Sequence, residues 1–299
     1  MKVGNQSQDL NNMQNDLNKL YQWTQDNNME FNSQKFQHMR YASNQSITGF
    51  YNAPGNENIL MTDHLRDLGI TMSSNGNFDQ HINLIAQKGH QMSGWILRSF
   101  ATRDPVPMLT LFKALVLPIV EYCCQLWSPK KQYLIKKIED VQRHFTAKIN
   151  GTEGLKYRQR LKLLVAYSLE RRRDRYTVIY VWKIIQGLAP NLLGSDKIRC
   201  NELNQRLGRY CILPSLNRAA PNYVQTLREN SFSIHGPKLF NELPKQIRNF
   251  NGSLETFKLK LDEYLSRVED VPYDPGEPRS APSNSLKDQI PQARLVFRA

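Results

Sequence analysis

The chain has 299 residues and a mass of 34.8 kDa, with 40% hydrophobic and 22% charged residues. This composition supports a packed core in one or two domains and excludes a fibrous or wholly disordered chain. Basic residues outnumber acidic ones by 40 to 27, which gives a net charge of +13 and a pI near 9.6.

The sequence also indicates where the chain resides. It has no run of the roughly 20 apolar residues that span a bilayer. Residues 1–10 lack the apolar core of a secretory signal. Four cysteines in 299 residues do not make a disulfide scaffold. We therefore expect an intracellular protein of the nucleus or cytoplasm that is neither secreted nor bound to a membrane.

The N-terminal 75 residues predict a helix laid against a small antiparallel sheet. Apolar residues recur at helical spacing over residues 8–26. Short runs bounded by turn residues then follow at 35–41, 46–51, 57–62 and 65–72, with a turn signal at Pro54-Gly55-Asn56.

From residue 76 the apolar period is that of helices, and most of the predicted helices have a recognisable start signal. The start signals, in chain order, are Asn77, Asp104-Pro105, Ser128-Pro129, Ser168 and Ser253. Two of the predicted helices lie at about 154–166 and 168–187. Short strands are predicted at 209–213 and 231–234, and His235-Gly236-Pro237 is predicted to be a turn.

The predicted fold is α+β and predominantly α-helical. We expect a small palm-like sheet region at 1–75, a helical thumb-like region at 76–190 and a C-terminal extension at 191–270. The last segment, 271–299, is rich in proline and is predicted to be disordered.

The motifs of common catalytic sites are missing from the sequence. It has no glycine-rich phosphate loop, no G-x-S-x-G and no C-x-x-C, and its six histidines are scattered. The acidic pairs Glu139-Asp140 and Asp262-Glu263 lie in amphipathic stretches, where they are typical of a solvated face. We therefore expect no metal or cofactor site.

The positive charge is concentrated in one stretch of the chain. Residues 130–183 hold 15 basic and 5 acidic residues. Such a block favours a polyanion, nucleic acid before a membrane surface. A solvated helical face without a partner explains the same composition.

Several short segments, spread in order over about 250 residues, together suggest a family. They are Leu17, Leu20 and Trp23 with Asn28, Phe31-Asn32 and Lys35; Leu68-Gly69-Ile70; Leu115-Val116 with Pro118-Ile119 and Glu121-Tyr122; Leu126-Trp127-Ser128-Pro129; Ile138-Glu139 with Val141-Gln142-Arg143, Phe145, Lys148 and Gly151; Arg160-Leu161; Ser168-Leu169-Glu170 with Arg172-Arg173; Ser231-Phe232; Gly236-Pro237-Lys238-Leu239-Phe240-Asn241 with Leu243-Pro244; and Phe257-Lys258.

On these segments the chain resembles the C-terminal half of the reverse transcriptase (RNA-directed DNA polymerase) of jockey-like non-LTR retrotransposons, the LINE class of transposable elements. The resemblance implies palm motifs D and E, a helical thumb and a C-terminal block, in which Phe240 is more usually Trp. In the parent enzyme this part holds the template–primer duplex.

The catalytic aspartates of that family, which bind Mg²⁺, lie upstream of the matching segment and have no counterpart in this chain. Lys35 matches the motif D lysine and is a vestige without those aspartates. We therefore expect a catalytically inactive fragment that needs no cofactor and retains binding to an RNA or DNA duplex. The alternatives are an exapted nucleic-acid-binding protein, a non-functional remnant of the element, or a helical protein–protein adaptor.

Nine basic residues are the candidate nucleic-acid contacts: Lys136, Arg143, Lys148, Arg158, Arg160, Arg171, Arg172, Arg173 and Arg175. The last four follow Ser168, a credible N-cap, so they crowd the first two turns of a helix. Amide groups at a helix N-terminus and guanidinium groups together suit a phosphate. The rival interpretation is a helix that starts near Arg158 with merely exposed arginines.

Overall fold

The computed structural model describes residues 7–32, 35–41, 51–53, 58–201, 208–214, 221–274 and 283–296. Helices dominate and the sheets are small, so the predicted α+β, predominantly α-helical class is confirmed. The chain divides into two compact units, Met1–His81 and Ile82–Ala299. The predicted division at residues 75, 190 and 270 stays a prediction.

The first unit contains one long helix and two small sheets. Its elements are α1 (Ser7–Asp26), β1 (Gln37–His38), β2 (Leu60–Met61), β3 (His64–Asp67) and β4 (Ile70–Ser73). β1 pairs with β2 in parallel and β3 pairs with β4 antiparallel, so the single antiparallel sheet that we predicted is wrong. The run at 46–51, apart from its last residue, and the turn at 54–56 lie outside the described residues.

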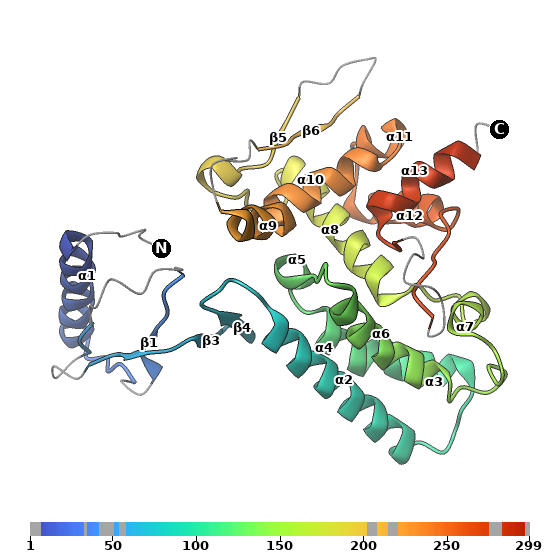
Figure 1. Ribbon diagram of the computed structural model, residues 1–299, viewed down its shortest axis with the longest axis horizontal. Helices are drawn as coiled ribbons and strands as arrows, with labels where there is room; N and C mark the ends of the chain where they lie inside the picture. The colour runs from blue at the N-terminus through green and yellow to red at the C-terminus, as the bar shows by residue number, and fades with distance from the viewer. Residues whose placement is uncertain are drawn as a thin grey trace. The chain divides into compact units, whose positions relative to one another are not determined.

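The second unit is built almost entirely of helices (Figure 1). Its elements are α2 (Asp79–Ser99), α3 (Pro105–Leu111), η2 (Phe112–Val116), α4 (Leu117–Glu121), α5 (Cys124–Trp127), α6 (Gln132–Thr146), α7 (Tyr157–Leu163), α8 (Leu169–Ile185), η3 (Gly194–Asp196), β5 (Arg199–Cys200), β6 (Cys211–Ile212), α9 (Asn222–Asn230), α10 (Phe232–Glu242), α11 (Lys245–Arg248), α12 (Leu254–Leu265) and α13 (Leu286–Val296).

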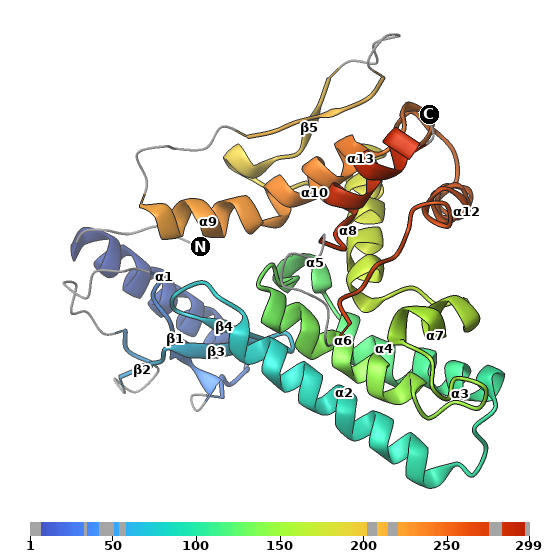
Figure 2. The same cartoon turned by 45° about the vertical axis from the view of Figure 1, so that its right-hand side comes forward.

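Helix α8 is central to this unit and packs against α5, α6 and α10 (Figures 1 and 2). Its inner stripe includes Val178, Val181 and Trp182, all fully buried. The Trp182 ring stacks on Phe257 of α12 at 4.4 Å between ring centroids. Burial of large apolar side chains on both sides of one helix supplies the main driving force for this arrangement.

Local capping signals fix several helix starts, as predicted. Ser168 accepts a hydrogen bond from the Arg171 amide, and Ser253 accepts one from the Thr256 amide. Asp104 is the N-cap of α3, with proline at the next position. In contrast, α6 begins at Gln132, three residues beyond Ser128-Pro129.

Two predictions for the segment before residue 245 are corrected by the structure. Residues 231–234, predicted as a strand, begin helix α10, and His235-Gly236-Pro237 lies inside that helix rather than in a turn. A Cβ atom at Gly236 would lie 2.8 Å from Val181 Cγ2. Glycine is therefore needed for α10 to approach α8 closely. The predicted strand at 209–213 contains β6, which pairs antiparallel with β5.

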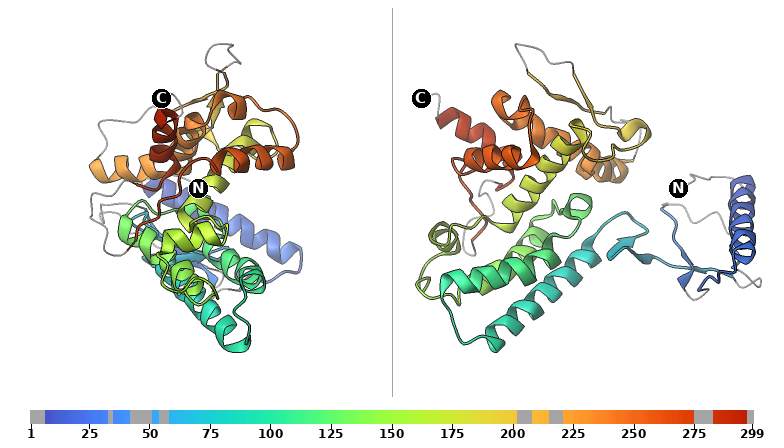
Figure 3. Two further views of the ribbon diagram at one scale, coloured as in Figure 1. Left: turned by 90° about the vertical axis from the view of Figure 1, so that its right-hand side faces the viewer. Right: turned by 180° about the vertical axis from the view of Figure 1, so that it is seen from behind.

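The C-terminal segment, predicted to be disordered, contains helix α13 and packs against α10 (Figure 3). Leu286 and Ile290 are fully buried. The Asp174 carboxylate accepts hydrogen bonds from the Leu286 amide at 2.9 Å and from the Ser285 hydroxyl at 3.0 Å. The prediction of disorder is wrong for residues 271–274 and 283–296, because two apolar side chains one helical turn apart outweigh the proline content.

Candidate nucleic-acid interface

The first turn of α8 was predicted to hold a phosphate, but its backbone donors are already occupied. The Glu139 carboxylate of α6 accepts hydrogen bonds from the Leu169 amide at 3.0 Å and from the Glu170 amide at 3.2 Å. The Arg171 amide donates to the Ser168 hydroxyl at 3.1 Å. With these donors satisfied internally, the helix N-terminus offers no site for an external anion.

The arginines that follow also point inward. Arg171 is 0% exposed and donates to the carbonyls of Val268 and Glu269. Arg173 is 1% exposed, and its charge opposes the rise in pKa that burial imposes on Glu139 and Glu170. These two side chains hold the core together and cannot reach a duplex.

Arg172 and Arg175 are half-buried and each forms an ion pair across the fold. The Arg172 guanidinium binds both carboxylate oxygens of Glu121, and that of Arg175 binds both oxygens of Asp262. Such two-point pairs have defined geometry and satisfy the charge of each arginine. The prediction that residues 171–175 form a phosphate site is therefore wrong. The helix does begin at Ser168, so the rival interpretation, a start near Arg158, is wrong as well.

Two further candidates, Arg143 and Arg160, lie beside the Tyr157 ring at the junction of α6 and α7. Arg143 is buried, pairs with Asp140 and donates to the Tyr273 carbonyl. Arg160 donates to the carbonyls of Leu155 and Arg143, and both guanidinium groups lie within 6 Å of the Tyr157 ring centroid. Arg158 on the same helix is half-buried.

The two predicted lysines differ in exposure. The Lys136 amino group lies 4.5 Å from the Tyr273 ring centroid in a cation–π contact, and its side chain is half-buried. Lys148 is exposed at the end of α6. Lys35 is exposed in the first unit.

A polar surface that the sequence reasoning missed lies where α2 and α6 run side by side (Figures 1 and 2). The Lys137 amino group donates to Asn83 Oδ1 at 2.6 Å, and the rings of His90 and His144 lie 5.3 Å apart. Asn83 and His90 are seven residues apart on α2, and Lys137 and His144 are seven residues apart on α6. The two helices are therefore parallel and in register at this surface.

We call this surface the α2–α6 face. It consists of one stripe from each helix at spacings of three and four residues: Asn83, Gln87, His90, Gly94 and Arg98 from α2, and Lys137, Asp140, His144 and Lys148 from α6 and its end.

The charge of the α2–α6 face is positive and displayed to solvent. Arg98, Lys137 and Lys148 are exposed. The Arg98 guanidinium folds back along the stripe, since its Nη1 lies 3.2 Å from the position of a Cβ at Gly94. Asp140 is the one acidic member, and it pairs with Arg143. The pKa of His90 is lowered, mainly by burial and then by the neighbouring His144.

A second group of titratable side chains lies in the core between α8 and α10. The Lys130 amino group lies 2.5 Å from His235 Nε2, and His235 lies 3.6 Å from the Asp174 carboxylate. Burial raises the pKa of Asp174, but the hydrogen bond with His235 and the charge of Lys130 outweigh it, so the pKa lies well below its ordinary value. Because Asp174 is buried and the His235 side chain is only 12% exposed, this group stabilises the fold rather than meeting a substrate.

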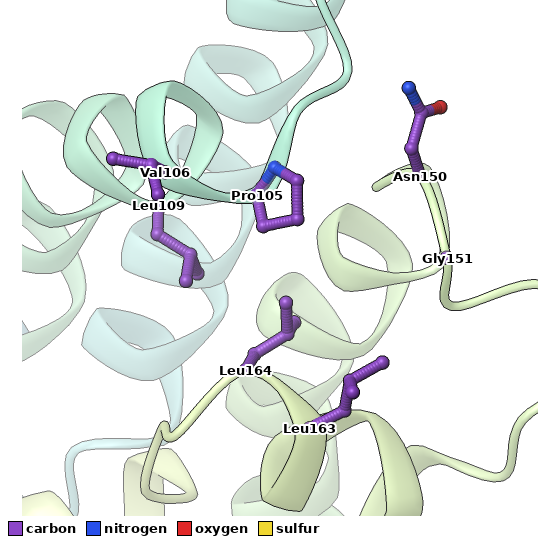
Figure 4. Close-up of a pocket in the computed structure, with 7 residues that line it drawn as sticks. All are labelled: Pro105, Val106, Leu109, Asn150, Gly151, Leu163 and Leu164. Carbon is purple, nitrogen blue, oxygen red and sulfur yellow. The ribbon is translucent and has the colours of Figure 1, made fainter.

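An open pocket of about 450 Å³ lies between α3 and α7 (Figure 4). Pro105, Val106 and Leu109 face Leu163 and Leu164 across it, and the backbone at Asn150-Gly151 closes one side. The lining contains no titratable side chain. Its chemistry suits an apolar group and offers nothing for proton transfer or metal binding.

Three further findings concern metal ligands, membrane-spanning helices and the similarity of this chain to known proteins. In the part of the chain that the structure describes, no three His, Cys, Asp or Glu side chains gather as metal ligands. Among those same residues, no helix is both long and apolar enough to cross a membrane. Comparison with protein-family models, with characterised proteins and with solved structures finds no match for this chain.

Proposed function

We propose that this chain is the duplex-holding part of a non-LTR retrotransposon reverse transcriptase and binds the sugar–phosphate backbone of nucleic acid without polymerising it. The observation that supports binding is the α2–α6 face, a paired-helix surface that carries Arg98, Lys137 and Lys148 in solvent. The resemblance of the sequence segments supports the origin. The proposed contacts differ from the arginines of α8, which are used within the fold.

The chemistry of this face suits phosphate rather than base edges. Lysine presents a compact charge with three donors and no fixed geometry, which matches a phosphate oxygen from many directions. At about 1.5 Å per residue, Lys137 and the last residue of α6, Thr146, are roughly 13 Å apart along the helix axis, which corresponds to about four nucleotide steps of one strand, and Lys148 follows in the next turn. Contacts of this kind position a duplex and carry no sequence information.

The rival function is that of a helical protein–protein adaptor. The pocket between α3 and α7 favours it, because Val106 is 77% exposed and Leu163 is 56% exposed at its rim. Exposed apolar side chains around a hollow are typical of interaction sites. A binding measurement on nucleic acid separates the two functions, since the adaptor needs no polyanion.

The test uses the full chain and fluorescently labelled oligonucleotides of equal length as DNA duplex, RNA–DNA hybrid and single strand at low salt. The proposal predicts binding to both duplexes with similar affinity for unrelated sequences, and no primer extension with Mg²⁺ or Mn²⁺. Absence of binding at about 50 mM salt, where backbone contacts are strong, would contradict the proposal. Nucleotide incorporation above that of a heat-inactivated sample would contradict the second part.

A further inference from the structure

The two cysteines of the β5–β6 pair lie directly opposite each other. Cys200 and Cys211 are register partners in this antiparallel pair, and their sulfur atoms are 3.4 Å apart. Both thiols are reduced. No other described cysteine has this arrangement: Cys123 is exposed, and its neighbour Cys124 is buried.

The backbone around Cys211 shows which kind of strand pair this is. The side chain of Asn241 in α10 accepts from the Cys211 amide at 2.7 Å and donates to the Cys211 carbonyl at 2.8 Å. Both backbone groups therefore point away from β5, so Cys200 and Cys211 form a non-hydrogen-bonded pair. In such pairs the Cα atoms are about 4.5 Å apart, which lies within the range of about 4.4–6.8 Å that disulfides require.

The two thiols differ in accessibility and acidity. Cys200 is half-buried, whereas Cys211 is fully buried. The hydrogen bond between the two thiols lowers the pKa of Cys200, and the charge of Arg209 lowers it further. The same hydrogen bond, together with burial, raises the pKa of Cys211. Because the thiolate is the reactive form, Cys200 is the attacking group and Cys211 the resolving one.

We propose that Cys200 and Cys211 are an oxidisable dithiol, a modification site that a small disulfide such as oxidised glutathione converts to an intramolecular disulfide. The Cys200 thiolate attacks one glutathione sulfur, forms a mixed disulfide and expels a glutathione thiolate. Cys211 then loses its proton to solvent and attacks the Cys200 sulfur, which releases the second glutathione thiolate. Two protein thiols are oxidised by two electrons, and one oxidised glutathione becomes two reduced molecules.

The arrangement does not suit a metal. The structure places two thiols together here, whereas a structural zinc ion takes four ligands. The described residues bring no third His, Cys, Asp or Glu to this pair. The chemistry that two opposed thiols can perform without further ligands is oxidation to a disulfide, which ties β5 to the strand held by Asn241.

The experiment exposes the full chain to oxidised glutathione and measures free thiols, intact mass and a non-reducing peptide map. We expect loss of two thiols, a mass lower by two hydrogen atoms, a linked peptide pair containing Cys200 and Cys211, and full reversal by dithiothreitol. A map that instead links either residue to Cys123, or that finds both unmodified after Cys123 has reacted, would overturn the proposal.

Three variants separate the roles of the thiols. Cys211→Ser removes the resolving thiol and should accumulate one glutathione on Cys200. Cys200→Ser leaves only the buried thiol of the pair and should react at this site at least tenfold more slowly. Cys123→Ser is the matched control and should form the disulfide at the wild-type rate. Equal reaction rates of the first two variants would show that the pair does not act as proposed.

Discussion

Glu139 Oε1 of helix α6 accepts a hydrogen bond from the Leu169 amide at the N-terminus of α8, over 3.0 Å. The same oxygen accepts from the Tyr157 hydroxyl, and Oε2 accepts from the Glu170 amide. A carboxylate of the chain itself therefore occupies the place where the sequence predicted a bound phosphate. The negative charge is also favourable there, because the N-terminal end of a helix is positive.

The first prediction concerns this buried carboxylate. Glu139→Ala leaves the Tyr157 hydroxyl and two backbone amides without their acceptor, and each unsatisfied buried donor costs about 1–3 kcal/mol. We expect the free energy of unfolding to fall by roughly 3–5 kcal/mol. Glu139→Gln keeps one acceptor oxygen and should lose less than half as much. Urea denaturation at pH 7 measures both, and equal losses would contradict the capping role.

The second prediction concerns pH. Burial raises the pKa of Glu170 to about 8, from an ordinary value near 4.5. Between these two pH values Glu170 is protonated in the folded chain and ionised in the unfolded chain, so its contribution to stability falls as pH rises from about 4.5 to about 8. Glu170→Gln resembles the protonated acid and should flatten this fall.

Unfolding by urea at several pH values in that range measures the effect. Glu255→Gln, at an exposed carboxylate, is the matched control and should leave the pH profile unchanged. The contribution of Asp174 has the opposite sign, because its pKa is lowered in the fold, and it is lost only in strong acid. If the free energy of unfolding of Glu170→Gln falls with pH as steeply as that of the wild type, the raised pKa is wrongly assigned to Glu170.

The third prediction concerns the C-terminal helix. Ile290 is fully buried, so Ile290→Ala should lower the free energy of unfolding by about 2–5 kcal/mol. Lys287 lies on the exposed side of the same helix, and Lys287→Ala should change it by less than about 0.5 kcal/mol. Thermal and urea unfolding compare the pair. If neither substitution changes the free energy of unfolding, the segment does not pack on the core, and the sequence-based prediction of disorder would hold.

Much of the local structure was readable from the sequence. Ser168, Ser253 and Asp104-Pro105 mark helix starts because capping depends on the side chains of a few neighbouring residues. Helical periodicity likewise located the buried stripe of α8. These signals come from residues that are close together in the sequence, so they can be read without knowledge of tertiary contacts.

The parts that failed depend on partners far along the chain. Arg171 is buried because the carbonyls of Val268 and Glu269, almost a hundred residues away, receive its guanidinium. Nothing near Arg171 in the sequence indicates that. The stripes of the α2–α6 face are visible in each helix separately, but only the folded chain shows that Lys137 meets Asn83.

The fourth prediction follows from the ion pairs of α8. Arg172→Gln leaves the Glu121 carboxylate without its partner and should lower the free energy of unfolding by about 1–3 kcal/mol. Because Arg172 is engaged within the fold, the substitution should leave nucleic-acid affinity within twofold of wild type. Binding is measured at a temperature where the variant is fully folded. A large loss of nucleic-acid affinity in the folded variant would show that Arg172 contacts nucleic acid after all.

The central claim is that the α2–α6 face binds phosphate, and the salt dependence of binding tests it most directly. Three backbone contacts give a log–log slope of about −2.7 on B-form DNA. Substituting Arg98, Lys137 and Lys148 together with Gln should flatten the wild-type slope by about two to three units. A control variant with Gln at Lys156, Lys162 and Lys197 removes three exposed charges elsewhere and should flatten it by less than one unit. Equal slopes for the two triple variants would contradict the claim.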